Sequence, residues 1–394
     1  MKRKLIVSII LFTLALGAFA GDFAFPSLYL LSNGYFDANE SFIIATQFDF
    51  SLAFRSQTNL ATEIVLSFYT NSLEDYFLAE QTPLTVTNNP DDLANSLGIL
   101  NAQNFAGIKR IAITIPQIFV PGISASFFSG HYDALGSKTV VKKAGTYKAL
   151  LPYITDRVYM PLGINNTGLR WYEGIHPVFG TGLKLSYTGK SFETSAYIYQ
   201  DSWIGNGYYS SDIRFMVFSP HVSLDVFGGI SFPQGPWGLY RMGLFFNYNT
   251  GDIAEITAQI GVPYWMSGTA LTMDMFYFML EPRVNFGAGY LTLAIFFHPG
   301  YFAQQETHES GMLDFKAALA LGSLEKGGLQ SGIEALLRLN PNVASNQFSM
   351  AVSPFISMNQ AKTQWQIKLS MAILPIQASW YTMFSPSVMV QILE

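Results

Sequence analysis

The stretch Phe42–Arg55, FIIATQFDFSLAFR, alternates between apolar and polar side chains with a period of two. The even positions are apolar apart from one threonine: Phe42, Ile44, Thr46, Phe48, Phe50, Leu52 and Phe54. The odd positions from 47 on are polar or small: Gln47, Asp49, Ser51, Ala53 and Arg55. Successive side chains of a strand point to opposite faces, whereas a helix repeats every ~3.6 residues. The stretch therefore predicts a β-strand with one apolar and one polar face.

The same alternation returns along the whole chain, with polar turns between the segments. It is clearest at 60–68, 240–248, 254–264, 313–321, 329–339 and 365–373. Placing boundaries by this pattern gives the predicted strands 23–31, 42–55, 60–69, 107–118, 123–132, 178–187, 191–200, 210–219, 221–232, 239–249, 253–264, 270–280, 284–298, 312–323, 329–339, 347–356, 364–374 and 376–393. Because strand boundaries are the least reliable feature of such a pattern, we expect about 16–18 strands.

Composition indicates what the apolar faces contact. The chain has 394 residues, of which 49% are hydrophobic and only 12% charged, and it contains no Cys. A soluble domain is usually about a quarter charged. After residue 20 no apolar run is long enough for a membrane-spanning helix, and lipid admits only helices and closed barrels. The sequence thus predicts an all-β protein, a transmembrane antiparallel up-and-down β-barrel.

A soluble β-sandwich or β-helix is the alternative fold. Its outer face would be rich in Lys, Glu and Thr. Here the polar faces are mostly Ser, Gln, Ala and Gly with an occasional charge, which is typical of a shared lumen. Short connections, which such barrels place on the periplasmic side, interleave with the longer connections expected outside. Two connections fit this rhythm poorly: 357–363 is long for its side, and Pro375 alone would be a very tight outer turn.

The first twenty residues have the features of a secretory signal peptide. Lys2, Arg3 and Lys4 precede the apolar run 5–16, and Ala18-Phe19-Ala20 fits the small-residue cleavage rule. The expected mature chain, 21–394, is a single barrel domain. An N-terminal membrane anchor is the alternative reading of 1–20. The formal net charge of −5 becomes more negative without these basic residues, which disfavours non-specific nucleic-acid binding.

Two expected outer loops, near 70–106 and 133–177, are much longer than the others. The first is acidic, and the second contains a group of bases: Lys138, Lys142, Lys143, Lys148 and Arg157. We hypothesise that one of these loops folds into the lumen as a constriction, with opposite charges facing each other. The alternative is two solvated loops whose charges never meet.

Scattered charges on the polar faces are the candidate lumen-facing residues. They are Glu63, Lys184, Glu193, Asp225, Arg241, Glu255, Asp274, Asp314, Lys316, Glu334, Arg338 and Lys368. A charge facing lipid costs about 2–4 kcal/mol near the bilayer midplane, so these residues should share the inner face. They would line a water-filled path of mixed charge, or else pair with one another inside a narrow or plugged barrel.

No motif for catalysis, metal binding or cofactor binding stands out. The five His residues form no metal-ligand pair, and no nucleophile-elbow motif occurs. Lys184–Ser191, KLSYTGKS, imitates the end of a phosphate-binding loop but lacks its first glycine, so it is better interpreted as a hairpin turn. We therefore expect neither an enzyme nor a bound cofactor or metal.

These features together resemble bacterial outer-membrane β-barrel proteins of porin size, across nearly the whole mature chain. One departure is the C-terminus, where 388–394 alternate but end without an aromatic residue. The resemblance implies contact with outer-membrane lipid, folding by the barrel-assembly machinery, and passive diffusion of small hydrophilic solutes. A barrel similar to fatty-acid transporters, or a non-conducting surface adhesin or structural barrel, is the alternative. The oligomeric state is left open.

Overall fold

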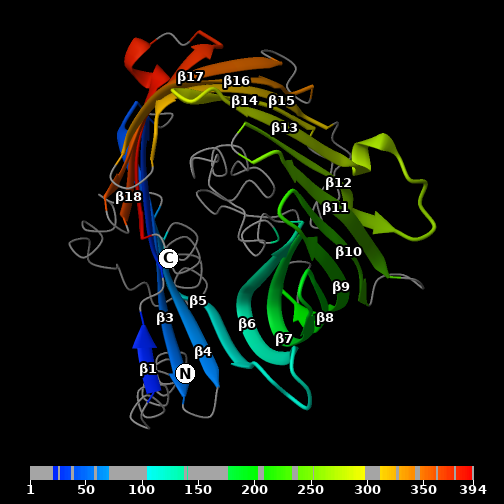
Figure 1. The fold of residues 1–394 in the computed structure, drawn as a ribbon. Helices are drawn as coiled ribbons and strands as arrows, with labels where there is room; N and C mark the ends of the chain where they lie inside the picture. Colours follow the sequence, from blue (N-terminus) through cyan, green and yellow to red (C-terminus); the bar gives the residue numbers. More distant parts are fainter. Residues whose placement is uncertain are drawn as a thin grey trace, which may run out of the picture.

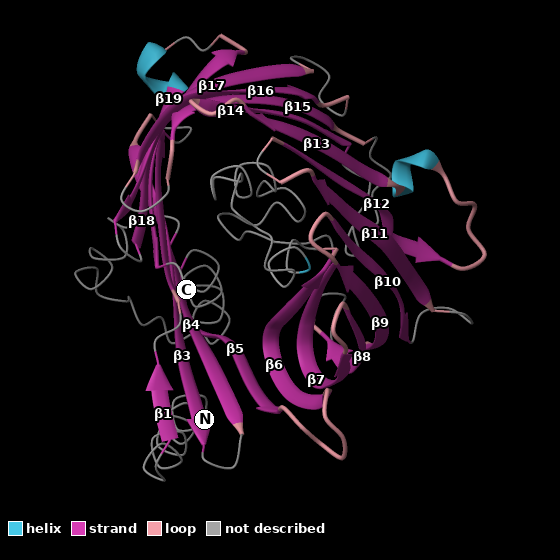
Figure 2. Cartoon of the chain, in the orientation of Figure 1, coloured by secondary structure: helices cyan, strands magenta, loops and turns pink. Residues whose placement is uncertain are grey.

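The computed structural model is a single closed antiparallel β-barrel (Figures 1 and 2). It describes residues 21–24, 27–36, 40–56, 60–70, 104–136, 140, 176–202, 208–232, 238–251, 253–297, 311–324, 328–341, 347–360, 363–376 and 379–392. The expected signal peptide, 1–20, lies outside these residues. In the described residues neither helix is long and apolar enough to cross a membrane.

The strands follow one another around the barrel in chain order. Their bounds are β1 Gly21–Ala24, β2 Leu28–Phe36, β3 Phe42–Ser56, β4 Ala61–Thr70, β5 Asn104–Ile115, β6 Ile123–Leu135, β7 His176–Thr188, β8 Phe192–Asp201, β9 Tyr209–Phe218, β10 Val222–Phe232, β11 Leu239–Asn249, β12 Ala254–Met266, β13 Tyr277–Asn285, β14 Gly289–Phe297, β15 Leu313–Gly322, β16 Leu329–Leu339, β17 Phe348–Gln360, β18 Thr363–Leu374 and β19 Phe384–Ile392. Two short 3₁₀ helices, η1 (Met273–Met275) and η2 (Trp380–Met383), lie in connections.

Closure of the barrel comes from pairing between β19 and β2. The sheet has 19 segments, but β1 and β2 both pair with β3 and together form one interrupted strand. The barrel is therefore 18-stranded, which confirms the predicted fold class and strand number. Short connections gather at one end, the short-turn end, and the connections β4–β5 and β6–β7 leave the other, the long-loop end.

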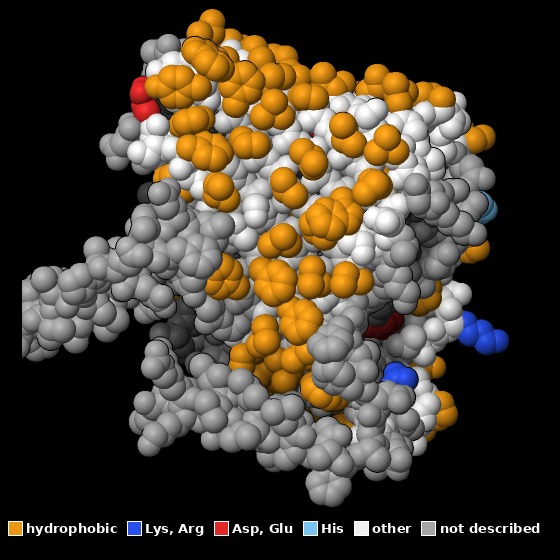
Figure 3. Space-filling model, turned by 90° about the vertical axis from the view of Figure 1, so that its left-hand side faces the viewer, with side chains coloured by type: hydrophobic (Ala, Val, Ile, Leu, Met, Phe, Trp, Pro, Cys, Tyr) orange, Lys and Arg blue, Asp and Glu red, His pale blue; other side chains and the backbone are white. Residues whose placement is uncertain are grey.

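The predicted alternation separates two environments. On β9 exposed and buried residues alternate strictly from Tyr209 to Met216, and the exposed ones on the outside include Ile213 and Phe215. Figure 3 shows one outer face of the barrel, over which hydrophobic side chains are spread with few charges between them. The buried face of the strands carries most of the polar and charged residues, so the polar side of the alternation faces the inside.

Four predicted boundaries were wrong. Residues 281–283 were expected to be a short connection between the strands 270–280 and 284–298, but they lie inside β13, where Pro282 faces a gap in the ladder to β14. The turn is at 286–288 instead.

Residues 270–276, expected in a strand, form a connection that contains η1. Asp274 is therefore exposed there and does not face the lumen. The two poorly fitting connections also change, since β17 and β18 leave only 361–362 between them and 375–383 link β18 to β19.

Side chains extend the short seam between β2 and β19. The ladder joins only Tyr29–Asn33 with Ser387–Gln391. Nearer the long-loop end, the Ser385 hydroxyl donates to the Gly34 carbonyl at 2.6 Å. The carboxylate of Glu40, a residue with a left-handed φ of 63°, accepts hydrogen bonds from the Ser379 and Tyr381 hydroxyls at 2.9 and 2.5 Å. Glu40 thus ties the β2–β3 turn to the β18–β19 connection across the seam.

Tight packing inside the wall also depends on glycine. Gly243, Gly261 and Tyr277 are register neighbours on the inner face of β11, β12 and β13. A Cβ on either glycine would lie 2.5 Å from the Tyr277 hydroxyl, and at Gly261 also 2.5 Å from the Met242 carbonyl oxygen. The tyrosine therefore lies across positions that only glycine can occupy.

We expect Gly261→Ala to lower the free energy of unfolding by about 1–3 kcal/mol, because the added methyl meets backbone that has no room to move. Urea unfolding of the barrel in micelles measures this. Gly228→Ala is the matched control, since the nearest atom to its added Cβ would be 3.8 Å away and its φ is ordinary. Equal stability of the two variants would contradict the packing described.

Hydrogen bonds from Tyr381 and Ser379 lower the pKa of Glu40. A carboxyl whose pKa is lowered in the folded state adds stability above its unfolded pKa of about 4.3, and this is lost as pH falls through the folded value. Glu40→Gln should therefore lower the thermal transition at pH 7 but not below about pH 3. Asp274→Asn, which removes an exposed carboxylate far from the seam in sequence, should leave the transition unchanged. A Glu40→Gln effect that persists at low pH would contradict this role.

Candidate functional site: the inner wall of the barrel

The inner wall carries the charges that sequence alternation assigned to a lumen. Apart from Asp274, the predicted residues lie in strands on the polar, inward face: Glu63, Lys184, Glu193, Asp225, Arg241, Glu255, Asp314, Lys316, Glu334, Arg338 and Lys368. Each follows the period of two that puts exposed apolar neighbours outside. The structure joins them in ion pairs, some with one another and some with residues that the sequence patterns missed.

Arg214 on β9 is the centre of the first cluster. Its guanidinium donates through Nε and Nη2 to both carboxylate oxygens of Asp225 on β10, at 2.9 and 2.6 Å. Its Nη1 donates to Asp133 of β6 at 3.0 Å. Tyr197 also donates to Asp133, at 2.7 Å, and the Lys184 ammonium lies 3.5 Å from it. One guanidinium thus satisfies two carboxylates from different strands, in the bidentate geometry that favours arginine.

Arg241 on β11 forms the second cluster. It donates to the Asp212 carboxylate at 2.7 Å, to the Ser231 hydroxyl at 2.6 Å and to the Tyr199 hydroxyl at 3.1 Å. Its Nη1 also lies 3.5 Å from Asp201. A Cβ at residue 229 would lie 1.7 Å from the Asp212 carboxylate, so this network also requires glycine beside it.

Further ion pairs continue around the wall. Glu334 of β16 accepts from Lys368 of β18 at 3.0 Å and lies 3.4 Å from Lys316 of β15. Arg338 binds Asp314 with two hydrogen bonds of 2.8 and 2.9 Å. Arg283 of β13 pairs with Glu281 of the same strand and with Glu255 of β12. Ion pairs between acids and bases therefore occur on the inner wall at most of the strands from β6 to β18.

Lys109 and Arg110 pair with Asp49 and Glu63 in a further charged group, and the sequence patterns missed the two bases. The Lys109 ammonium lies 2.5 Å from the Asp49 carboxylate, and Arg110 pairs with Glu63. Consecutive residues of a regular strand point to opposite faces, so alternation gave no reason to put both bases inside. A register shift between β4 and β5 allows both bases to reach inward carboxylates. Val65 pairs with Arg110 and Leu66 with Ile108, which leaves Lys109 as the extra residue of a bulge.

Several other inward residues could have been found in the sequence. Ser210, Asp212 and Arg214 follow the same period of two on β9. Glu281 and Arg283 were missed because their segment was interpreted as a turn. Asp133 was assigned to a loop, but β6 continues to Leu135. In the described residues no group of three or more metal-ligating side chains occurs.

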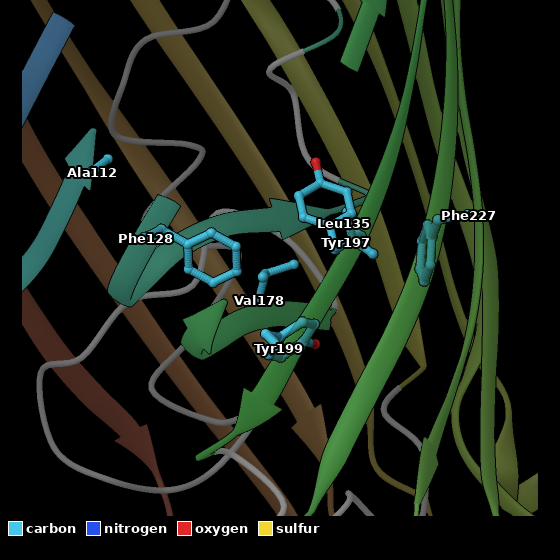
Figure 4. Close-up of a cluster of buried hydrophobic side chains, with 7 residues drawn as sticks. All are labelled: Ala112, Phe128, Leu135, Val178, Tyr197, Tyr199 and Phe227. Atoms are coloured by element: carbon cyan, nitrogen blue, oxygen red, sulfur yellow. The ribbon is translucent and has the colours of Figure 1, made fainter. Parts of the chain in front are cut away.

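An apolar cluster also lies inside, on β5–β8 and β10 (Figure 4). Its members are all buried: Ala112, Phe128, Leu135, Val178, Tyr197, Tyr199 and Phe227. Tyr132 stacks on Phe128 with 4.3 Å between ring centroids, and Lys184 lies over the rings of Tyr132 and Tyr197. This cluster packs the end of β6 against inward side chains of β7, β8 and β10.

The chain after β6 turns inward. The Gly136 amide donates to Asp225 at 3.1 Å, and Val140 is fully buried against Met216 of β9 and Phe245 of β11. Met216 and Phe245 belong to the inward face, so Gly136 and Val140 of the expected 133–177 loop lie inside the barrel. The bases Lys138, Lys142, Lys143, Lys148 and Arg157 lie outside the described residues, as does 71–103 of the other loop.

A closed 18-stranded wall with an apolar outside and a charged inside characterises a known architecture. The chain has the fold of the outer-membrane barrel porins. This assignment rests on the strand pairing and on the two faces described above. The predicted resemblance to outer-membrane barrels of porin size is thereby confirmed at the level of architecture.

Comparison with solved structures gives matches at low sequence identity. OprD of Pseudomonas aeruginosa is 10% identical, with a TM-score of 0.49, and the match covers 93% of this chain and 94% of that one. OpdK of the same organism is 9% identical, with a TM-score of 0.48 and coverage of 94% and 98%. A triple mutant of Rh. blastica porin is 8% identical, with a TM-score of 0.43 and coverage of 94% and 99%. No family model matches the sequence, and a search of curated proteins found no match.

We expect Arg214→Met to lower the free energy of unfolding by about 3–5 kcal/mol, because it leaves Asp225 and Asp133 without their guanidinium partner in a buried site. Urea unfolding in micelles measures the change, and Asp225→Asn in the same chain should restore part of it. Arg110→Met is the control, because its side chain and that of its partner Glu63 are 28% and 35% exposed and a pair at such a site contributes only about 0–1 kcal/mol. Equal losses of unfolding free energy in the two variants would contradict the larger contribution expected of the buried ion pair.

Proposed function

We propose that the protein is a channel of the bacterial outer membrane, through which small hydrophilic solutes diffuse passively. The observation that carries this proposal is the polar, charged inner wall of a closed 18-stranded barrel whose outside is apolar. Barrels of about 16–18 strands are wide enough for an aqueous lumen. A wall of fixed charges suits solutes that keep much of their hydration.

The proposal includes the route to the membrane. Residues 1–20 direct export, the barrel-assembly machinery inserts the chain, and outer-membrane lipid covers the apolar face. Gly136 and Val140 narrow the lumen from within, because they contact Asp225, Met216 and Phe245 of the inner wall. The remaining residues of the expected 133–177 loop, with their five bases, would extend the constriction.

The protein is proposed as a channel and not as an enzyme. The inward titratable groups of the described strands are arranged as ion pairs between acids and bases. Ion pairs of this kind neutralise and stiffen a wall, whereas catalysis needs a nucleophile or base aimed at a substrate position.

The inward apolar cluster of Figure 4 favours a second candidate, an uptake barrel for hydrophobic ligands. Such a barrel binds its ligand in an apolar pocket. In this structure the cluster's side chains pack on one another, with exposed fractions of 4% or less. We therefore place the hydrophilic channel first.

Planar-bilayer conductance of the refolded mature chain tests the proposal, after heat-modifiable gel migration has confirmed a folded barrel. We expect discrete ohmic steps, which an open aqueous path produces. Heat-denatured protein from the same preparation is the control. A folded barrel that gives no steps would contradict the channel, and lipid or fatty acid extracted from it would then support the second candidate.

A further inference from the structure

Charged residues of the inner wall differ sharply in their access to solvent. On β9–β13 they are buried: the Arg214 and Asp225 side chains are 1% and 0% exposed, and those of Arg283 and Glu255 are 1% each. On β4 and β5 the Lys109, Arg110 and Glu63 side chains are 32%, 28% and 35% exposed. Among the ion pairs of the described strands, accessible charge is therefore concentrated on β4 and β5, and Arg338 of β16, at 32%, is the one comparably exposed partner elsewhere.

The inward segment accounts for part of this difference. Leu135, Gly136 and Val140 are buried against side chains of β8–β11, including Tyr197, Asp225 and Phe245. The wall under them cannot contact a passing solute. Gly136 and Val140 make their contacts on β9–β11, and the salt bridges on β3–β5 keep water access.

The β5 bulge gives this side its charge. It places Lys109 and Arg110, consecutive in sequence, against the inward carboxylates of Asp49 and Glu63. Arg110 also donates to the Tyr132 carbonyl at 3.3 Å, which fixes its guanidinium near β6. Arg55, on the same face of β3 and exposed, adds a third base. Bases therefore outnumber the two acids on the inward face of β3–β5.

From this distribution we propose that solutes pass along β3–β5, and that Lys109 and Arg110 make the path selective for small anions. The inference rests on the proposed channel function and assigns its selectivity. Exposed ammonium and guanidinium groups attract anions, and fixed charge in a low-dielectric lumen raises the local concentration of counter-ions. Asp49 and Glu63 hold the two bases in place while leaving part of each open to solvent.

The chain contains no Cys, so single cysteines report accessibility without background. Lys109→Cys and Arg110→Cys should react in the folded barrel with a negatively charged methanethiosulfonate reagent, read as a mass shift. Ser223→Cys and Thr257→Cys, at buried inward positions, should react at least about tenfold more slowly until the barrel is unfolded. Equal labelling at all four positions would overturn the proposed path.

Reversal potentials in a KCl gradient test the selectivity. Lys109→Glu and Arg110→Glu should each shift the potential toward cation preference, and Asp49→Asn should shift it toward anions. Lys190→Glu makes the same charge change in the exposed β7–β8 turn and should shift it little. An unchanged potential in a conducting Lys109→Glu barrel would overturn the assignment.

The labelling result separates this inference from the channel function. It is read by mass on the folded protein, without any current. A barrel that labels at Lys109→Cys but never conducts would contradict the proposed function, whereas one that conducts and labels only at Thr257→Cys would contradict the path.

Discussion

Backbone hydrogen bonding within one closed sheet is the constraint on which the rest of this structure depends. A strand that faces lipid has no water to pair with its N–H and C=O groups, so each must find a partner in a neighbouring strand. Pairing of β19 with β2 removes the last open edges of the ladder. Beside that short ladder, side-chain hydrogen bonds of Glu40, Ser379, Tyr381 and Ser385 add further links across the seam.

Closure in turn sets the chemistry of the interior. Every second side chain of 18 strands points into a shared space, so polar residues that are far apart in sequence must satisfy one another. Arginine is suited to this task because its fork can bind two carboxylates at once. Arg214 joins β6, β9 and β10 in this way, and Arg241 joins β8, β9, β10 and β11. These side-chain bonds connect strands that are not adjacent in the backbone ladder, such as β6 with β9 and β8 with β11, and so stiffen the wall.

The two sides of the lumen have different roles in this arrangement. Along β8–β11 the inner wall carries the inward segment, and its charges neutralise one another out of contact with solvent. Along β3–β5 the wall keeps accessible charge. The inner wall thus carries buried ion pairs on β8–β11 and partly exposed ion pairs on β3–β5. Part of this difference follows from the contacts of Gly136 and Val140 with β9–β11.

The period of two in stretches such as Phe42–Arg55 was sufficient to predict the barrel, its approximate strand number and the inward position of residues such as Asp225, Arg241 and Glu334. Such a pattern is local, because each residue's face depends only on its own strand. Tertiary structure alone decided the partners of those residues, the inward course at Gly136 and Val140, and the shared face of Lys109 and Arg110. These features depend on register between strands, and a bulge or an interrupted ladder such as that at Pro282 changes the register without disturbing the alternation on either side.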